Sequence, residues 1–230
     1  MAAEASALEL VLGGDPALFA IVRLSLAVSL SATLLAALLG APLGALIALS
    51  RFPGRQAAVV ALNALMGLPP VVVGLAIYLL LSRAGPLGSF GLLFTAPAMV
   101  ITQTILVLPI IAALTRQTIE DLWLEYRDEL AAMGVGPLRR ARTLLWDARF
   151  SLVTALLAGF GRAAAEVGSI IIVGGNIEGF TRTMTTTIAL ETSKGNLPLA
   201  MGLGLLLICI VLLVNVAAWA VKQLGARFER

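Results

Sequence analysis

The sequence predicts an all-α integral membrane protein with about five transmembrane helices. Of its 230 residues, 60% are hydrophobic and only 13% are charged, whereas about a quarter of a soluble domain is charged. A chain of this size cannot bury so much apolar surface in one aqueous core. Uncharged segments long enough to cross a bilayer, about 20 residues each, also recur along the chain. Lipid is therefore the expected solvent for most of the molecule.

Five segments are expected to cross the membrane, within a single transmembrane domain that covers residues 1–230. They lie at about 20–50, 57–82, 94–115, 150–174 and 197–221. Several contain residues that weaken a helix, and in the membrane such backbone is tolerated only where protein or a water-filled cavity satisfies it. Kinks or close helix contacts are therefore expected at Gly40, Pro42, Gly44, Pro69, Pro70, Gly74 and Pro109.

The distribution of Lys and Arg predicts the orientation, because cytoplasmic connections carry an excess of both. With the N-terminus outside, the inner segments hold Arg51, Arg55, Arg116, Arg127, Arg139, Arg140, Arg142, Arg149, Lys222, Arg227 and Arg230. The outer loops hold only Arg83, Arg182 and Lys194, while Arg23 and Arg162 lie at or within spans. The predicted topology is N-out and C-in, in the cell (inner, cytoplasmic) membrane.

Several functional classes are excluded or disfavoured by composition. The chain contains no His and a single Cys, so histidine-based metal sites, catalytic triads and intrachain disulfides are not expected. The acidic start MAAEASALEL lacks the basic region of a cleaved signal peptide. No GxxxxGK[ST] run occurs, so ATP is not expected to bind to this chain. The basic residues form no single patch, and nucleic acid is not an expected partner.

Residues 116–149 form the longest charged segment and lie on the predicted inner face. Leu122, Tyr126, Leu130 and Met133 recur at helical spacing and make one apolar stripe. Glycines then interrupt the pattern, and Pro137 suits the first residue of a new helix. The segment therefore predicts a helix, a glycine turn and a second helix. Periodicity alone leaves open whether this hairpin lies on lipid headgroups or binds another protein.

The end of the first helix, Asp-Glu-Leu-Ala-Ala-Met-Gly at 128–134, resembles the EAA motif of ABC importer permeases. This resemblance implies a coupling hairpin between spans 3 and 4 that contacts an ATPase subunit. The residues that it assigns to that contact are Asp128, Glu129, Ala131, Ala132, Gly134 and Leu138. The copy departs from the family pattern, since Asp128 replaces the usual Glu and Trp146-Asp147 replaces the usual Leu-Pro.

The segment GFGRAAAEVGSIIIVGGNIEGFTRTMTTTIALETSKGNL, residues 159–197, closely resembles the sulfate, molybdate and tungstate permeases. Together with WDARFS at 146–151 it is most similar to the tungstate branch. The resemblance implies that the anion pathway or gate involves Arg162, Glu166, Asn176, Thr181, Arg182 and Thr183. From the residues alone, Arg162 and Glu166 are one helical turn apart and are either a structural ion pair or part of the pathway. The Thr-rich loop either docks a partner or contacts the anion directly.

The resemblance implies a homodimeric permease, with two cytoplasmic ATPase subunits that bind ATP–Mg and an extracytoplasmic oxyanion-binding protein. Tungstate is the expected substrate, followed by molybdate, and membrane lipid surrounds the spans. No catalytic residue, metal site or cofactor is expected in the chain itself, which is not expected to be an enzyme. The alternative is an ion-coupled secondary anion transporter. In that class Glu166 would be the ionisable residue, although its neighbour Arg162 would keep it charged.

Overall fold

The computed structural model describes residues 16–228, all as helices and their connections, with the side chains of 221–222 and 224–228 left out. The prediction of an all-helical chain is confirmed for this part, in which no strand occurs. The elements are α2 (Pro16–Leu49), α3 (Arg55–Met66), α4 (Pro70–Leu81), the short 3-10 helix η1 (Gly88–Phe90), α5 (Ala96–Ala132), α6 (Pro137–Asp147), α7 (Arg149–Ala164), α8 (Gly168–Gly174), α9 (Met184–Ser193) and α10 (Leu197–Phe228).

The described residues contain three to five candidate membrane spans, depending on how two bent helix pairs are counted. The segments Pro16–Leu49, Ala96–Ala132 and Leu197–Ala220 are each long and apolar enough to cross a bilayer. The pairs α3–α4 and α6–α7 qualify only jointly, and they are bent by 97° and 72°. The segment predicted at 57–82 is therefore two helices rather than one. Proline explains the break, because Pro70 lacks an N–H to extend α3 and the residue before it is held extended, with Pro69 at ψ 120°.

Two other predicted segments also differ in their helical limits. The helix that begins near residue 94 continues to Ala132 without interruption, past the charged residues that mark the predicted end of the span at 115. The segment predicted at 150–174 is divided into α7 and α8 by residues 165–167. Pro42 and Pro109, by contrast, lie inside uninterrupted helices.

The helices α2 and α5 pack closely along their length because glycine removes the side chain at the contact. A Cβ atom added to Gly44 would overlap the carbonyl oxygen of Ala112 and lie 2.9 Å from the amide nitrogen of Arg116. At Gly40 it would lie 3.1 Å from the carbonyl oxygen of Leu108. The prediction of close contacts at these two glycines is confirmed.

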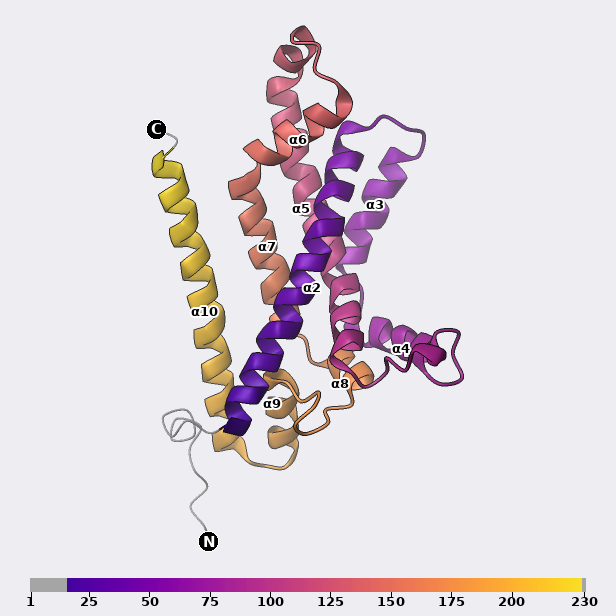
Figure 1. Ribbon diagram of the computed structural model, residues 1–230, viewed down its shortest axis with the longest axis vertical. Coiled ribbons are helices and arrows are strands. Elements are labelled where there is room, and N and C mark those ends of the chain that lie inside the picture. Colours follow the sequence, from indigo (N-terminus) through magenta and orange to yellow (C-terminus); the bar gives the residue numbers. More distant parts are fainter. Residues whose placement is uncertain (1–15, 229–230) are drawn as a thin grey trace.

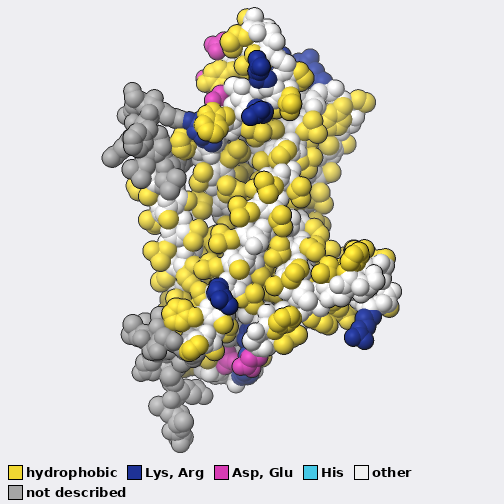
Figure 2. Space-filling view, in the orientation of Figure 1, with side chains coloured by type: hydrophobic (Ala, Val, Ile, Leu, Met, Phe, Trp, Pro, Cys, Tyr) yellow, Lys and Arg dark blue, Asp and Glu magenta, His cyan; other side chains and the backbone are white. Residues whose placement is uncertain are grey.

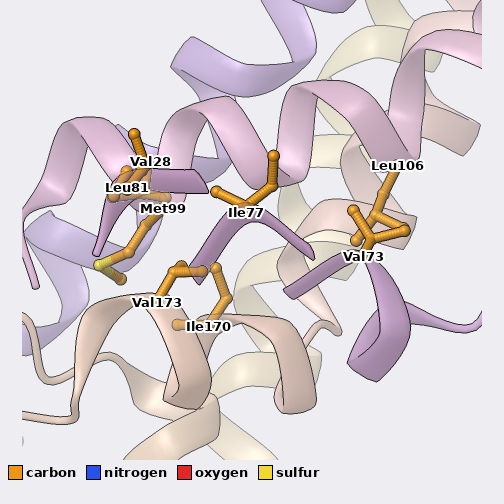
Figure 3. Packing of buried hydrophobic residues seen from close by; sticks show 9 residues of the cluster. Val28, Val73, Ile77, Leu81, Met99, Leu106, Ile170 and Val173 are labelled. Carbon is orange, nitrogen blue, oxygen red and sulfur yellow. The ribbon is translucent and has the colours of Figure 1, made fainter. Parts of the chain in front are cut away.

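In Figure 1, α2, α5 and α7 run side by side, with α10 beside them. The α5–α6 hairpin projects at the end where α10 terminates, and α4, α8 and α9 lie toward the other end. There an apolar core joins four helices (Figure 3): Val28 of α2, Val73, Ile77 and Leu81 of α4, Met99 and Leu106 of α5, and Ile170 and Val173 of α8. On the face shown in Figure 2, hydrophobic side chains cover the middle and charged ones gather at the ends, as expected for a bilayer-spanning body.

Candidate functional site

The predicted helix–turn–helix of residues 116–149 is present as the end of α5, a turn and α6. The turn depends on Gly134, which has φ +63°, a conformation that favours glycine. It closes α5 because the amide of Val135 donates to the carbonyl oxygen of Leu130 at 3.1 Å. Pro137 is the first residue of α6, as predicted.

One face of the hairpin packs on the helical body. Leu130 and Leu144 are buried with Ile119 and the α2 residues Ala45 and Ala48. Leu122 and Tyr126 of the predicted stripe pack against this cluster, whereas Met133 is exposed. The guanidinium of Arg140 lies 5.0 Å from the centre of the Trp123 ring and donates to the carbonyl oxygen of Val135 at 2.8 Å. These contacts hold α6 against α5.

The other face of the hairpin is exposed and partly apolar. Met133, Leu138 and Trp146 are 67%, 77% and 68% exposed, and Leu138 and Trp146 line a shallow groove with Arg139 and Arg142. We call these five residues the hairpin patch. The remaining residues predicted to contact an ATPase are also exposed at the same end: Asp128, Glu129, Ala131, Ala132 and Gly134.

A charged cluster that the sequence did not predict lies at the base of the hairpin. The Glu120 carboxylate on α5 accepts hydrogen bonds from Arg116, one turn away, and from Arg55 at the start of α3. Arg55 also donates from Nε to the carbonyl oxygen of Ile47 at 2.9 Å. The cluster therefore ties the α2–α3 connection to α5. Only the Arg116–Glu120 spacing was visible in the sequence.

At the other end, Arg162 and Glu166 form the ion pair expected from their spacing. Arg162 Nη1 lies 2.6 Å from Glu166 Oε2, and the Glu166 side chain is only 5% exposed. Its Oε1 accepts from the amide and hydroxyl of Ser169, at 3.0 and 3.1 Å. The carboxylate thus accepts from the buried Ser169 amide at the start of α8, which has no partner within the helix, and this position favours negative charge. This bonding accounts for the break between α7 and α8.

The hydroxyls of the Thr-rich loop are used within the protein. Thr183 caps α9 in a reciprocal arrangement with Thr186, and Thr185 donates to the carbonyl oxygen of Glu166 at 2.8 Å. Thr181 is fully buried and bonds the backbone at Gly174 and Ile177. These donors shape the loop in this conformation instead of facing an open channel.

The other two predicted pathway residues lie on the same loop. Asn176 adopts φ +50°, and its Oδ1 is buried without a partner. Arg182 Nη1 lies 3.3 Å from Glu178 Oε2. The structure therefore brings Arg162, Glu166 and the start of α9 together, while Arg182 pairs with Glu178 of its own loop.

A small cavity with a mixed apolar and polar lining lies beside Glu166, and sequence reasoning did not find its residue Gln103. Gln103 of α5 donates to the carbonyl oxygen of Ala163 at 3.0 Å, and its Oε1 is buried without a partner. The cavity has a volume of about 20 Å³, enough for about one water molecule and too small for a tetrahedral oxyanion. It is lined in part by Ser25, Ser29, Gln103, Glu166, Thr183 and Thr185. A buried Gln in an uncharged span was the only sequence signal.

The turn from α9 to α10 predicts a pH effect on stability. Lys194 Nζ donates to Glu191 at 2.8 Å and Asn196 donates at 3.2 Å, and the Lys194 hydrogen bond lowers the pKa of the Glu191 carboxyl. A carboxyl whose pKa is lowered by folding stabilises the folded protein at pH values above its unfolded-state pKa. That contribution is lost as the pH falls through its folded-state pKa. Melting temperature measured against pH should therefore decline less in acid for Glu191→Gln than for the wild type. An identical decline would contradict this role.

A bundle that contains helices of bilayer length, with an exposed hairpin at one end, indicates an integral membrane protein. No protein-family model matches the chain. The chain is 43% identical over 217 residues to a probable anion ABC transporter permease protein of Haloferax volcanii, covering 92% of the chain and 90% of that protein. It is 37% identical over 218 residues to the tungstate uptake system permease protein TupB of Peptoclostridium acidaminophilum, covering 95% and 96%. The Campylobacter jejuni TupB is 41% identical over 158 residues, covering 69% and 66%.

The chain therefore belongs to the family of anion ABC transporter permeases. Within that family it lies near the tungstate branch, as the motifs at 146–151 and 159–197 indicated.

Proposed function

We propose that this chain is the permease subunit of an ABC importer that moves a tetrahedral oxyanion inward, tungstate first and molybdate second. ATP–Mg is bound and hydrolysed on a separate subunit. The observation that carries this proposal is the near full-length similarity to a tungstate uptake permease. The chain works as a homodimer, is fed by an extracytoplasmic oxyanion-binding protein and contributes no covalent chemistry.

The proposed topology has five spans, N-out and C-in: α2, the bent pair α3–α4, the first part of α5, α7 with α8, and α10. It places the α5–α6 hairpin in the cytoplasm together with most Lys and Arg residues. The start of α2 and the loop before α9, which lie near each other in Figure 1, are then outside. The same orientation places the Arg162–Glu166 pair, whose carboxylate is nearly buried, toward the outer side of the membrane.

The hairpin patch is the proposed contact for the ATPase. Its exposed Met133, Leu138 and Trp146 offer the kind of apolar and aromatic surface that forms the centre of protein interfaces. Arg139 and Arg142 are the charged members of the patch, and Asp128 and Glu129 are exposed near the end of α5. Because the opposite face of the hairpin is packed on α2 and α5, a push on the patch is transmitted to the body.

The anion pathway is closed beside Glu166 in this conformation, since the cavity there holds about one water molecule. Transport therefore requires α9 and the end of α7 to separate. Thr185, which donates to the carbonyl oxygen of Glu166, is one contact that such opening would break. An alternating-access cycle driven from the hairpin would supply that motion.

The test is reconstitution of the chain with its partner ATPase in proteoliposomes, with binding protein loaded with tungstate, molybdate or sulfate. ATP-dependent uptake, greatest with tungstate-loaded binding protein, is the expected result. Tungstate uptake that needs only a proton or sodium gradient, without ATP, would overturn the proposal in favour of a secondary carrier.

Gly134→Val is expected to uncouple ATP hydrolysis from uptake. A β-branched residue at φ +63° costs about 1–2 kcal/mol, so the turn shifts and the hairpin patch is misaligned. The matched control is Gly136→Val, because Gly136 has φ −70° in extended backbone and an added Cβ meets no atom within 4 Å at either glycine. Uptake per ATP hydrolysed should fall about tenfold in the first variant and stay near the wild-type value in the second. Equal effects would show that the turn conformation does not matter.

A further inference from the structure

A recess of about 400 Å³ opens between the start of α2 and the loop before α9. Its charged lining residues are Arg23 on α2 and Glu178 and Arg182 on the loop. The α2 side of the recess is built mainly from small or aliphatic residues, among them Ala20, Ala27 and Leu24. We propose that this recess is a binding site for a tetrahedral oxyanion group, with Arg23 and Arg182 as its cationic ligands. As the receiving site for the transported anion, it rests on the proposed function.

A hydrogen bond between α2 and the start of α9 lies close in sequence to both arginines. The amide of Met184 donates to Ser25 Oγ at 2.8 Å. Arg23 lies two residues before Ser25, and Arg182 lies two residues before Met184. Ser25 also donates to the carbonyl oxygen of Ile21, one turn back on α2, at 2.8 Å. The relative position of the two backbones is therefore fixed next to the recess.

The charge of the recess favours an anion. Among the residues that the structure describes, no carboxylate lies within ion-pair distance of Arg23. Arg182 is paired through Nη1 with Glu178, but its Nε is buried without a partner. The described lining of the recess thus contains two guanidinium groups and one carboxylate. Guanidinium groups recognise tetrahedral oxyanions through directed, charge-assisted hydrogen bonds.

The Glu178 carboxylate would compete with a bound anion for the Arg182 guanidinium. Its side chain is 84% exposed and its distance to Arg182 is 3.3 Å, and exposed ion pairs are worth little. An entering dianion can therefore displace this carboxylate at small cost, which leaves two cations to match two negative charges. Removing the Glu178 charge should strengthen binding.

The recess also lies next to the closed cavity beside Glu166. Ser25 and Met184 line that cavity, while Arg23 and Arg182 line the recess. The Ser25–Met184 contact therefore lies between the two spaces. In the proposed topology, an anion received outside by the arginines would reach the interior when this contact opens.

A lipid headgroup phosphate has the same chemistry as a free oxyanion, and Arg23 lies near one end of a membrane helix. Two arms of the experiment separate these sources, using the permease–ATPase complex in nanodiscs without binding protein. The first arm measures equilibrium binding of radiolabelled tungstate in discs of phosphatidylcholine. The second arm measures phosphatidylglycerol retained on the complex by mass spectrometry, from discs that contain this lipid.

The variants are Arg23→Gln, Arg182→Gln and Glu178→Gln, with Arg83→Gln as a matched control. Arg83 is an exposed residue outside the recess, with the same charge change on the same predicted side. Loss of one charge-assisted ligand should weaken binding about tenfold or more in the two recess arginine variants. Binding should be tighter in Glu178→Gln and unchanged in Arg83→Gln.

Arginine-dependent tungstate binding in the first arm supports an oxyanion site for free substrate. Arginine-dependent lipid retention without tungstate binding supports the site with a headgroup phosphate as its ligand. If neither ligand depends on Arg23 or Arg182, the inference is overturned. ATP-driven uptake by the wild type is measured separately. Its absence would overturn the proposed function, whereas the binding measurements would still test the recess.

Discussion

Arg162→Gln is expected to lower the free energy of unfolding by about 3 kcal/mol, the lower end of the range for removing one partner of a buried ion pair. The reason is that the Glu166 carboxylate, which is almost fully buried, would lose the cation that pairs with it. The two donors of Ser169 remain and keep the loss from being larger. Unfolding by a denaturing detergent, followed by circular dichroism, measures the change.

The double variant Arg162→Gln/Glu166→Gln is the control, because it removes both charges and leaves two amides that can bond each other. Its stability should recover most of the loss, whereas additive losses would contradict a direct pair. Uptake by the double variant then separates the two interpretations of the pair. Stability and uptake that recover together indicate a structural role, while recovered stability without uptake places the charges in the anion pathway.

Gly44→Leu is expected to separate α2 from α5 and to destabilise the folded chain by about 3 kcal/mol or more, the upper end of the range for overpacking. The atoms that meet the new side chain belong to the α5 backbone at Ala112 and Arg116, so rotation of a neighbouring side chain cannot relieve the overlap. Melting temperature in lipid nanodiscs and the yield of monodisperse protein are the measurements.

Two other glycine substitutions calibrate this result. Gly204→Leu on α10 adds the same side chain where no atom lies within 4 Å of a new Cβ, and it should leave the melting temperature unchanged or slightly raised. Gly40→Ala, with a 3.1 Å approach to the Leu108 carbonyl oxygen, should fall between the two. An equal effect at Gly44 and Gly204 would show that helix contact is not the cause.

Much of the fold was predictable because its signals are local. Uncharged windows located the long helices, and the spacing of Gly134, Gly136 and Pro137 located the hairpin turn. The i,i+4 spacing of Arg162 and Glu166 also predicted their pairing. Each of these features depends on neighbours within a few residues, which a single sequence displays directly.

The features that were missed depend on contacts between distant segments. Pro69 and Pro70 marked a weak point, but only packing of α4 against α5 and α8 decides on a 97° bend rather than a kink. Charges after residue 115 suggested a connection, yet a helix can leave the membrane and continue in water with its charged side solvated. Gln103 and Arg23 carry no local pattern that reveals the cavity or recess that they line.

The uninterrupted helix α5 connects the cavity beside Glu166 to the hairpin as one rigid element. At 1.5 Å per residue, its 37 residues reach about 56 Å, more than the thickness of a bilayer. Gln103 and Glu129 are separated by about 39 Å along that helix. A tilt of only about 5° about Gln103 would therefore move the hairpin end by about 3 Å. Small rotations of the helix within the membrane therefore correspond to displacements of several ångströms at the hairpin. The Gln103–Ala163 hydrogen bond lies close to the point of rotation.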